Sequence, residues 1–179
     1  MKYEIILSGK GGQGLILAGI ILAEAAAIYE GLHVVQTQSY GPEARGGASK
    51  SEVIISDEPI DFPKVTCADI VVALSQEACD SYSGMLKKGG ILIVDEDEVK
   101  RIPEVEGRVY RIPFTRMAVE ELGKAIVTNI ITLGALIGLT NILSPESVMK
   151  AIENRTPKGT EEMNRKAFEV GLRVAKGLA

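Results

Sequence analysis

Residues 3–38 read YEIILSGKGGQGLILAGIILAEAAAIYEGLHVVQTQ, and this stretch decides the fold. Residues 3–8 are an apolar run that predicts a buried strand, and the glycine-rich turn at residues 9–14 ends it. Residues 15–29 are apolar on nearly every face, which predicts a helix buried on more than one side. Residues 33–38 predict a second strand. A strand, glycine loop, helix and strand in this order favour parallel pairing through a right-handed crossover.

The rest of the chain extends this pattern. Further strands are predicted at residues 48–56, 69–75, 91–95 and 108–114, and helices at residues 76–86, 116–123, 127–139, 144–154 and from Thr160 onward. Pro113 lies at the end of the last predicted strand, which places that strand near an edge of the sheet. We therefore predict one domain over residues 1–179 with an α/β fold. The expected architecture is a three-layer α/β/α sandwich with a mostly parallel sheet and a helical C-terminal end.

Composition and charge exclude several classes of function. The 179 residues carry 20 Lys and Arg against 24 Asp and Glu, a net charge of −4, and no basic cluster offers a footprint for nucleic acid. The N-terminus lacks the apolar run of a signal peptide. The longest uncharged stretch, residues 125–141, is shorter than the ~20 apolar residues that span a bilayer. We expect a cytoplasmic protein that binds neither nucleic acid nor a membrane.

The residues that most often bind metals or catalyse reactions are scarce. Cys67 and Cys79 are the only cysteines, and His33 is the only histidine. Two thiols without C-x-x-C spacing cannot supply the four ligands of an iron–sulfur cluster, so we expect no metal site in this chain. We interpret the cysteines as reduced, partly buried side chains and His33 as structural. No nucleophile–base pair is marked by its spacing, so no catalytic residue is predicted.

The turn after the first strand is the first candidate binding site. Gly9, Gly11 and Gly14 satisfy the spacing G-x-G-x-x-G, with Gly12 and Gln13 inside it. Glycines let a phosphate approach the backbone closely, and the start of the following helix attracts an anion. A dinucleotide site also needs an acidic residue at the end of the second strand, where this chain has Gln-Thr-Gln. Three interpretations stay open: a dinucleotide site, contact with another phosphate or cofactor, and a turn needed only for packing.

The loop at residues 39–47 is the second candidate site. Its sequence SYGPEARGG combines turn-forming residues with Tyr40, Glu43 and Arg45. An arginine held next to Gly46 and Gly47 can bind a carboxylate or a phosphate in fork geometry. The alternative is an exposed Arg45 in a salt bridge with Glu43.

These segments resemble signatures of a known family. GKGGQG at residues 9–14, with the apolar helix after it, resembles the start of the gamma subunit of 2-oxoacid:ferredoxin oxidoreductases. QSYGPEARGGASKSEV at residues 38–53 is similar to a second family signature, and residues 68–76 are similar to a third. Within the family, this version is most similar to the 2-oxoglutarate enzymes. The pyruvate and indolepyruvate types share parts of it and remain alternatives.

The resemblance implies a holoenzyme of alpha, beta and gamma chains, often with a small ferredoxin-like delta chain. It implies thiamine diphosphate and Mg²⁺ mainly between the alpha and beta chains, [4Fe–4S] clusters that pass electrons to ferredoxin, and coenzyme A as the acyl acceptor. The implied reaction of the complex converts 2-oxoglutarate to succinyl-CoA, releases CO₂ and reduces ferredoxin. This chain alone is expected to be inactive and to bind none of these cofactors by itself.

For this chain, we expect scaffolding and a contribution to the coenzyme A cavity. Gly11, Gly12 and Gln13 are expected to face the diphosphate of coenzyme A. Arg45 is expected to pair with its phosphate or with a neighbouring subunit. Two other hypotheses stay open, a self-sufficient dinucleotide-dependent oxidoreductase and a purely structural subunit.

The two helices that are apolar all round, residues 15–29 and 127–139, leave a further choice. They either meet another subunit, with Gly134 and Gly138 permitting close approach, or pack on the faces of the sheet within the chain.

Overall fold

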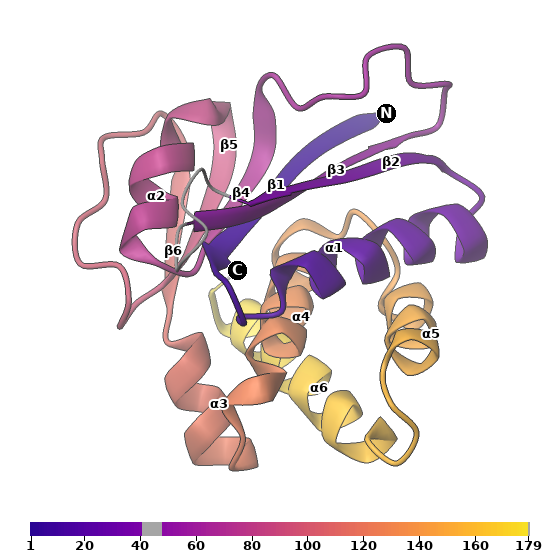
Figure 1. Cartoon of the computed structure of the whole chain (residues 1–179), viewed down its shortest axis with the longest axis vertical. Coiled ribbons are helices and arrows are strands. Elements are labelled where there is room, and N and C mark those ends of the chain that lie inside the picture. Colours follow the sequence, from indigo (N-terminus) through magenta and orange to yellow (C-terminus); the bar gives the residue numbers. More distant parts are fainter. Residues whose placement is uncertain (41–47, 179) are drawn as a thin grey trace.

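The computed structural model describes residues 1–40 and 48–178, and its strands form one mixed sheet with the order β2-β3-β1-β4-β5-β6 (Figure 1). The strands are β1 (Lys2–Lys10), β2 (His33–Tyr40), β3 (Ala48–Ser56), β4 (Ala68–Ala73), β5 (Leu86–Asp95) and β6 (Arg108–Ile112). β1 pairs in parallel with β4, β4 with β5, and β5 with β6. β3 pairs antiparallel with β1 and β2, so it alone runs against the others in the described sheet. The expectation of a mostly parallel sheet is confirmed.

The expected direct pairing of the first two strands is wrong, because β3 lies between β1 and β2. The burial of side chains gives the physical reason. Nearly every residue of β3 is buried, which suits a place inside the sheet. β2 contains Gln36, Thr37 and Gln38 in its middle, of which the last two are exposed, and these polar residues suit an edge. The more buried strand β3 therefore lies next to β1, and β2 lies outside it.

At the opposite edge of the sheet lies β6, as Pro113 predicted. β5 differs from the expectation, since it begins at Leu86 and includes Gly89 and Gly90, which were expected to precede it. Gly89 has a left-handed backbone with φ 81°, and the pairing of β4 with β5 shifts register in the same region. The glycines therefore bend the start of the strand instead of ending the helix before it.

Helices cover both faces of the sheet unequally (Figure 1). They are α1 (Leu15–Glu24) with its π-helical continuation η1 (Ala25–Tyr29), α2 (Gln76–Tyr82), the short η2 (Ser83–Met85), α3 (Phe114–Leu122), the short η3 (Ala125–Val127), α4 (Thr128–Thr140), α5 (Pro145–Arg155) and α6 (Glu161–Leu178). The larger apolar core joins one face to α1, α4, α5 and α6. A smaller core joins the other face to α2 and its flanking loops. This is the expected three-layer arrangement with a helical C-terminal end.

The packing of α4 answers the question about the second apolar helix. Ten of its residues, from Thr128 to Ile137, are buried, and the helix lies against α6. A Cβ added at Gly134 would collide with the carbonyl oxygen of Phe168, and one at Gly138 would lie 2.5 Å from the Cβ of Ala175. The two glycines therefore serve close packing inside the chain. Within the described residues, no helix combines the length and the apolar character needed to cross a membrane.

Candidate functional site

The glycine-rich turn lies between β1 and α1, at the end of the sheet where the parallel strands have their carboxyl ends. Gly12 (φ 86°) and Gly14 (φ 77°) have left-handed backbone conformations that favour glycine. Gly14 is the N-cap of α1, and a Cβ there would lie 2.6 Å from Nδ2 of Asn129. That amide nitrogen donates a hydrogen bond of 3.1 Å to the Gly14 carbonyl oxygen. Gly14 thus fixes the start of α1 against the start of α4.

Gln13 holds the turn together from inside. Its Oε1 accepts a hydrogen bond from the backbone N–H of Lys10 at 2.7 Å, and its Nε2 donates to the carbonyl oxygen of Leu74 at 3.2 Å. Its own backbone N–H donates to the Lys10 carbonyl oxygen at 3.3 Å. A Cβ at Gly9 would collide with Oε1 of this side chain, so a larger residue there would displace Gln13 from these hydrogen bonds. The polar groups of Gln13 are thus engaged in the turn, and the hypothesis that this residue faces a diphosphate gains no support.

Gly11 and Gly12 form the open part of the turn. Both are exposed, and a Cβ added at either would meet no atom within 4 Å among the described residues. Their backbone therefore leaves room for a ligand to approach next to the first residues of α1. Lys10 precedes them, and its Nζ lies 3.5 Å from a carboxylate oxygen of Glu98. A ligand at this turn would therefore meet the exposed backbone of Gly11 and Gly12 and the ammonium group of Lys10.

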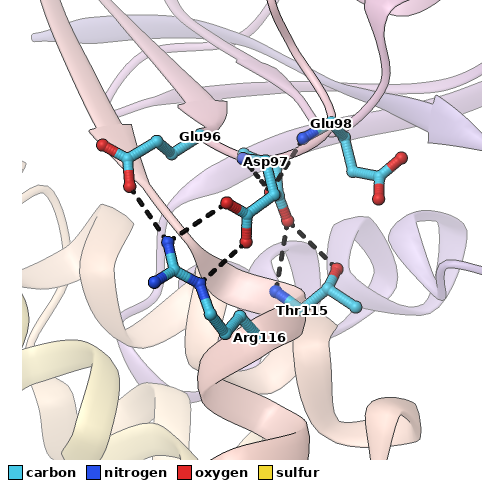
Figure 2. Close-up of polar contacts among 6 residues, drawn as sticks. Glu96, Asp97, Glu98, Thr115 and Arg116 are labelled. Atoms are coloured by element: carbon cyan, nitrogen blue, oxygen red, sulfur yellow. Dashed lines mark hydrogen bonds and ion pairs between the residues drawn. The ribbon is translucent and has the colours of Figure 1, made fainter.

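A buried carboxylate organises the loop that carries Glu98. Asp95 ends β5 and is completely buried. Its Oδ1 accepts hydrogen bonds from the backbone N–H groups of Asp97 at 3.0 Å and Glu98 at 3.3 Å. Its Oδ2 accepts from the backbone N–H of Thr115 at 3.1 Å and from its hydroxyl at 3.0 Å (Figure 2). Asp95 thereby ties the end of β5 to the first turn of α3, and sequence reasoning missed this role.

Arg116 fastens the same loop from the outside. Its guanidinium binds both carboxylate oxygens of Asp97, at 3.0 and 3.1 Å, and Glu96 at 3.2 Å (Figure 2). The hydrogen bond to Asp97 and the nearby negative charges raise the pKa of Arg116 above its ordinary value. The run of four acidic residues after a buried strand was the available sequence signal for this cluster.

A cavity of about 490 Å³ opens beside the glycine turn. It lies between the turn, the start of α1, the start of α4 and the start of α6. Its apolar walls include Leu15, Ile16, Ile126, Val127, Ile130 and Met163. Its polar groups include Lys10, Ser49, Asn129, Thr160 and Asn164. The volume and the mixture of apolar walls with few polar groups are typical of a small-molecule site.

The far wall of the cavity is fixed by the start of α6. The backbone N–H of Gly159 donates to the Glu161 carboxylate at 2.9 Å. Backbone hydrogen bonds from Glu161 itself and from Gly159 lower the pKa of this carboxyl. Asn164 is buried and donates from Nδ2 to the Thr160 hydroxyl at 3.0 Å. These contacts hold the loop before α6 in place at the cavity.

The second candidate site adjoins the first. Tyr40 is the last residue of β2 and pairs with Ser49, while Lys10 pairs with Ala48 at the start of β3. Tyr40 and Ala48, which flank residues 41–47, thus lie at the same end of the sheet as the glycine turn. Glu43, Arg45, Gly46 and Gly47 lie outside the described residues, so their roles stay predictions.

The two cysteines are far from equivalent. Cys67 is exposed, whereas Cys79 on α2 is buried. Burial, together with the negative charge of Asp80, raises the pKa of the Cys79 thiol. In the described part of the chain, no three His, Cys, Asp or Glu side chains come together as ligands for a metal ion.

Comparison with known proteins identifies the family. The family model described as pyruvate ferredoxin/flavodoxin oxidoreductase matches residues 4–174. This chain belongs to that family. The resemblance inferred from the glycine turn and the second signature is thereby confirmed. Relatives that are 62% and 34% identical to this chain carry the names of enzyme subunits.

Two 2-oxoglutarate synthase subunits KorC are among its relatives. The one from Methanocaldococcus jannaschii is 62% identical over 180 residues, which cover 99% of this chain and 96% of that protein. The one from Archaeoglobus fulgidus is 41% identical and covers 98% of this chain and 91% of that protein.

Two solved structures of oxidoreductase chains have the same fold as this chain. The gamma subunit of a keto/oxoacid ferredoxin oxidoreductase from Geobacter sulfurreducens has a TM-score of 0.91 and 51% identity, covering 99% of this chain and 98% of that one. A 2-oxoglutarate:ferredoxin oxidoreductase from Magnetococcus marinus, with 2-oxoglutarate, coenzyme A and succinyl-CoA bound, has a TM-score of 0.87 and 26% identity. The matched region covers 99% of this chain and 32% of the Magnetococcus chain.

Proposed function

We propose that this chain is the gamma subunit of a cytoplasmic 2-oxoglutarate:ferredoxin oxidoreductase. The complex would convert 2-oxoglutarate and coenzyme A to succinyl-CoA and CO₂ while ferredoxin takes up the electrons. The observation that carries this proposal is the 62% identity to a 2-oxoglutarate synthase subunit over nearly the whole of both chains. Relatives named for ketoisovalerate and pyruvate are only 31–35% identical. Residues 1–179 together would form a single gamma-subunit domain.

The partners of this chain would be the alpha and beta subunits, with a delta subunit where the complex has one, and ferredoxin reached through the complex. Thiamine diphosphate, Mg²⁺ and the [4Fe–4S] clusters would belong to those other subunits. The two cysteines of this sequence are fewer than the four thiolates that a [4Fe–4S] cluster needs. When bound there, these groups would supply decarboxylation and electron transfer. The residues of this chain would help to position and enclose coenzyme A.

The cavity beside the glycine turn is where this chain would contribute to coenzyme A binding. Its mouth carries Lys10 and the open backbone of Gly11 and Gly12, which suit phosphate oxygens. Its walls are largely apolar, and burying a charged phosphate among them would be costly. We therefore place the phosphates at the mouth and an uncharged part of coenzyme A against the walls. The bound coenzyme A in the Magnetococcus enzyme supports this choice of ligand.

The subunit assignment is tested by purifying the native complex through a tag on this chain. The purified complex is assayed for coenzyme A-dependent reduction of ferredoxin or a viologen dye with 2-oxoglutarate, pyruvate and branched 2-oxoacids. We expect larger iron- and thiamine-containing chains to co-purify and 2-oxoglutarate to give the highest kcat/KM. Recovery of the chain without larger partners, or a clear preference for pyruvate, would overturn the assignment.

The role of Arg45 is tested in the same complex. Replacement of Arg45 by Ala is expected to raise the KM for coenzyme A, because a fork-shaped cation for its phosphate is lost. Arg111→Ala, an exposed arginine on β6, is the matched control and should leave that KM unchanged. If Arg45→Ala alters neither the KM nor the assembly of the complex, Arg45 has no such role.

A further inference from the structure

β2 is an edge strand of the described sheet (Figure 1). It pairs with β3 over its whole length in continuous register, from His33 opposite Ser56 to Tyr40 opposite Ser49. In the described part of the chain, no strand pairs with its other side. The strand HVVQTQSY contains no proline and no Asp, Glu, Lys or Arg. Among the described residues, its outer backbone groups therefore form a long, regular row without a partner strand.

The opposite edge of the same sheet is protected. β6 is shorter and carries two exposed arginines, Arg108 and Arg111, and Pro113 follows it directly. Charged side chains and proline are the usual means by which proteins prevent edge strands from pairing with other chains. The contrast within one sheet shows that β2 lacks a protection that β6 has. An edge of this kind pairs readily with another strand.

A groove runs along the same edge, on the side of the larger helical layer. It has a volume of about 400 Å³ and an apolar part formed by Ile20, Ala23, Ala27, Ile28 and Val34. Its polar part is formed by Gln36 and by Glu24 and Arg155, which bind each other in an ion pair. Ile28 lies in the π-helical end of α1 and is 70% exposed, although its neighbours Ala25 and Ala26 are fully buried. Local π-helical turns often mark functional positions. The open edge and the exposed isoleucine thus point to one interface.

We propose that β2 pairs antiparallel with β2 of a second copy of this chain, about a two-fold axis normal to the sheet. The two six-stranded sheets would then join into one. This axis keeps the helical layers of both copies on the same side, so their α1 helices face each other above the joined strands. The grooves that contain Ile28 then open toward one another, and their apolar side chains leave water.

The charges at this edge are compatible with a second copy of the chain. β2 contains no Asp, Glu, Lys or Arg, so no register of the pair sets two carboxylates, or two Lys or Arg side chains, opposite each other. A two-fold contact uses the same patch on both subunits, and each open edge then satisfies the other. The Val and Thr side chains of β2 are well suited to cross-strand pairing.

The test is sedimentation velocity of the full chain over a range of concentrations. The wild-type chain of 19.1 kDa is expected to sediment as a dimer. Thr37→Lys places a charge on the exposed edge of β2 and should weaken dimerisation at least ten-fold in Kd. Thr66→Lys is the matched control, since Thr66 is exposed in a loop outside the sheet and should leave the Kd unchanged. Circular dichroism of both variants must match the wild type, which excludes unfolding as the cause.

A second variant tests the helical side of the interface. Ile28→Glu brings two carboxylates together across the axis and should also raise the Kd of the dimer. A wild-type chain that stays monomeric, or a dimer that Thr37→Lys and Ile28→Glu leave intact, would overturn the proposal. A monomeric chain whose β2 amides become protected from hydrogen exchange only in the native complex would assign the edge to another subunit instead. The oxoacid preference of the complex does not depend on this interface, so the two proposals fail separately.

Discussion

Gly171 is the position at which one added methyl group tests the packing that builds the cavity. It lies where α6 crosses α4. A Cβ there would be 2.7 Å from the backbone nitrogen of Ala135 and 2.8 Å from the Cα of Gly134, and would collide with the carbonyl oxygen of Ile131. These are backbone atoms, so no change of rotamer relieves the clash. The two helices must separate, and the cavity between their first turns must change with them.

The expected magnitude follows from two opposing terms. Overpacking that displaces backbone costs about 3 kcal/mol. Replacing glycine by alanine inside a helix offsets about 1 kcal/mol of this through helix propensity. We therefore expect Gly171→Ala to lower the free energy of unfolding by about 2 kcal/mol.

Gly177→Ala in the same helix is the control. Among the described residues, no atom lies within 4 Å of a Cβ at Gly177, so only the propensity gain remains. This variant should be more stable than the wild type by about 0.5 kcal/mol, since the position is close to the helix end. Urea denaturation followed by circular dichroism measures both changes. A Gly171→Ala chain as stable as Gly177→Ala would show that α4 and α6 do not cross this closely.

Two further predictions concern the buried polar groups. Asp95→Asn should lower the free energy of unfolding by about 2–3 kcal/mol, because an amide NH₂ would face hydrogen-bond donors in a fully buried site. Asp97→Asn, in a solvent-exposed ion pair with Arg116, should lower it by less than about 1 kcal/mol in the same urea titration. Because burial raises the pKa of the Cys79 thiol above its ordinary value of 9.0, its contribution to stability is present below the unfolded pKa and lost as the pH rises through the folded pKa. The urea midpoint of the wild type should therefore fall more steeply above pH 9.0 than that of Cys79→Ala, and equal slopes would contradict this reasoning.

Local patterns predicted the elements of the fold well. The glycine turn and the apolar helix after it lie where the sequence placed them, and Pro113 located an edge strand. The place of β3 between β1 and β2 could not be derived from periodicity. Strand order depends on how completely each strand is buried in the finished sheet, and β3 and β2 differ mainly in that respect.

The sequence predicted only those features of the candidate site that depend on neighbouring residues. The open backbone at Gly11 and Gly12 follows from the turn, whereas the inward role of Gln13 depends on the carbonyl of Leu74, which lies 61 positions along the chain. The cavity depends on Asn129, which is 115 positions from its partner Gly14. Such long-range contacts leave no periodic signal in one sequence.

The contribution of this chain to the coenzyme A cavity is tested most directly by Gly11→Leu in the assembled complex. Its side chain would enter open space at the mouth of the cavity without disturbing the fold. Gly84→Leu, an equally open glycine away from the cavity, is the control. We predict that Gly11→Leu raises the KM for coenzyme A about ten-fold, a loss of about 1.4 kcal/mol in binding, while the KM for 2-oxoglutarate and the subunit composition stay unchanged. An assembled Gly11→Leu complex with the wild-type KM for coenzyme A would contradict the proposed role of the cavity.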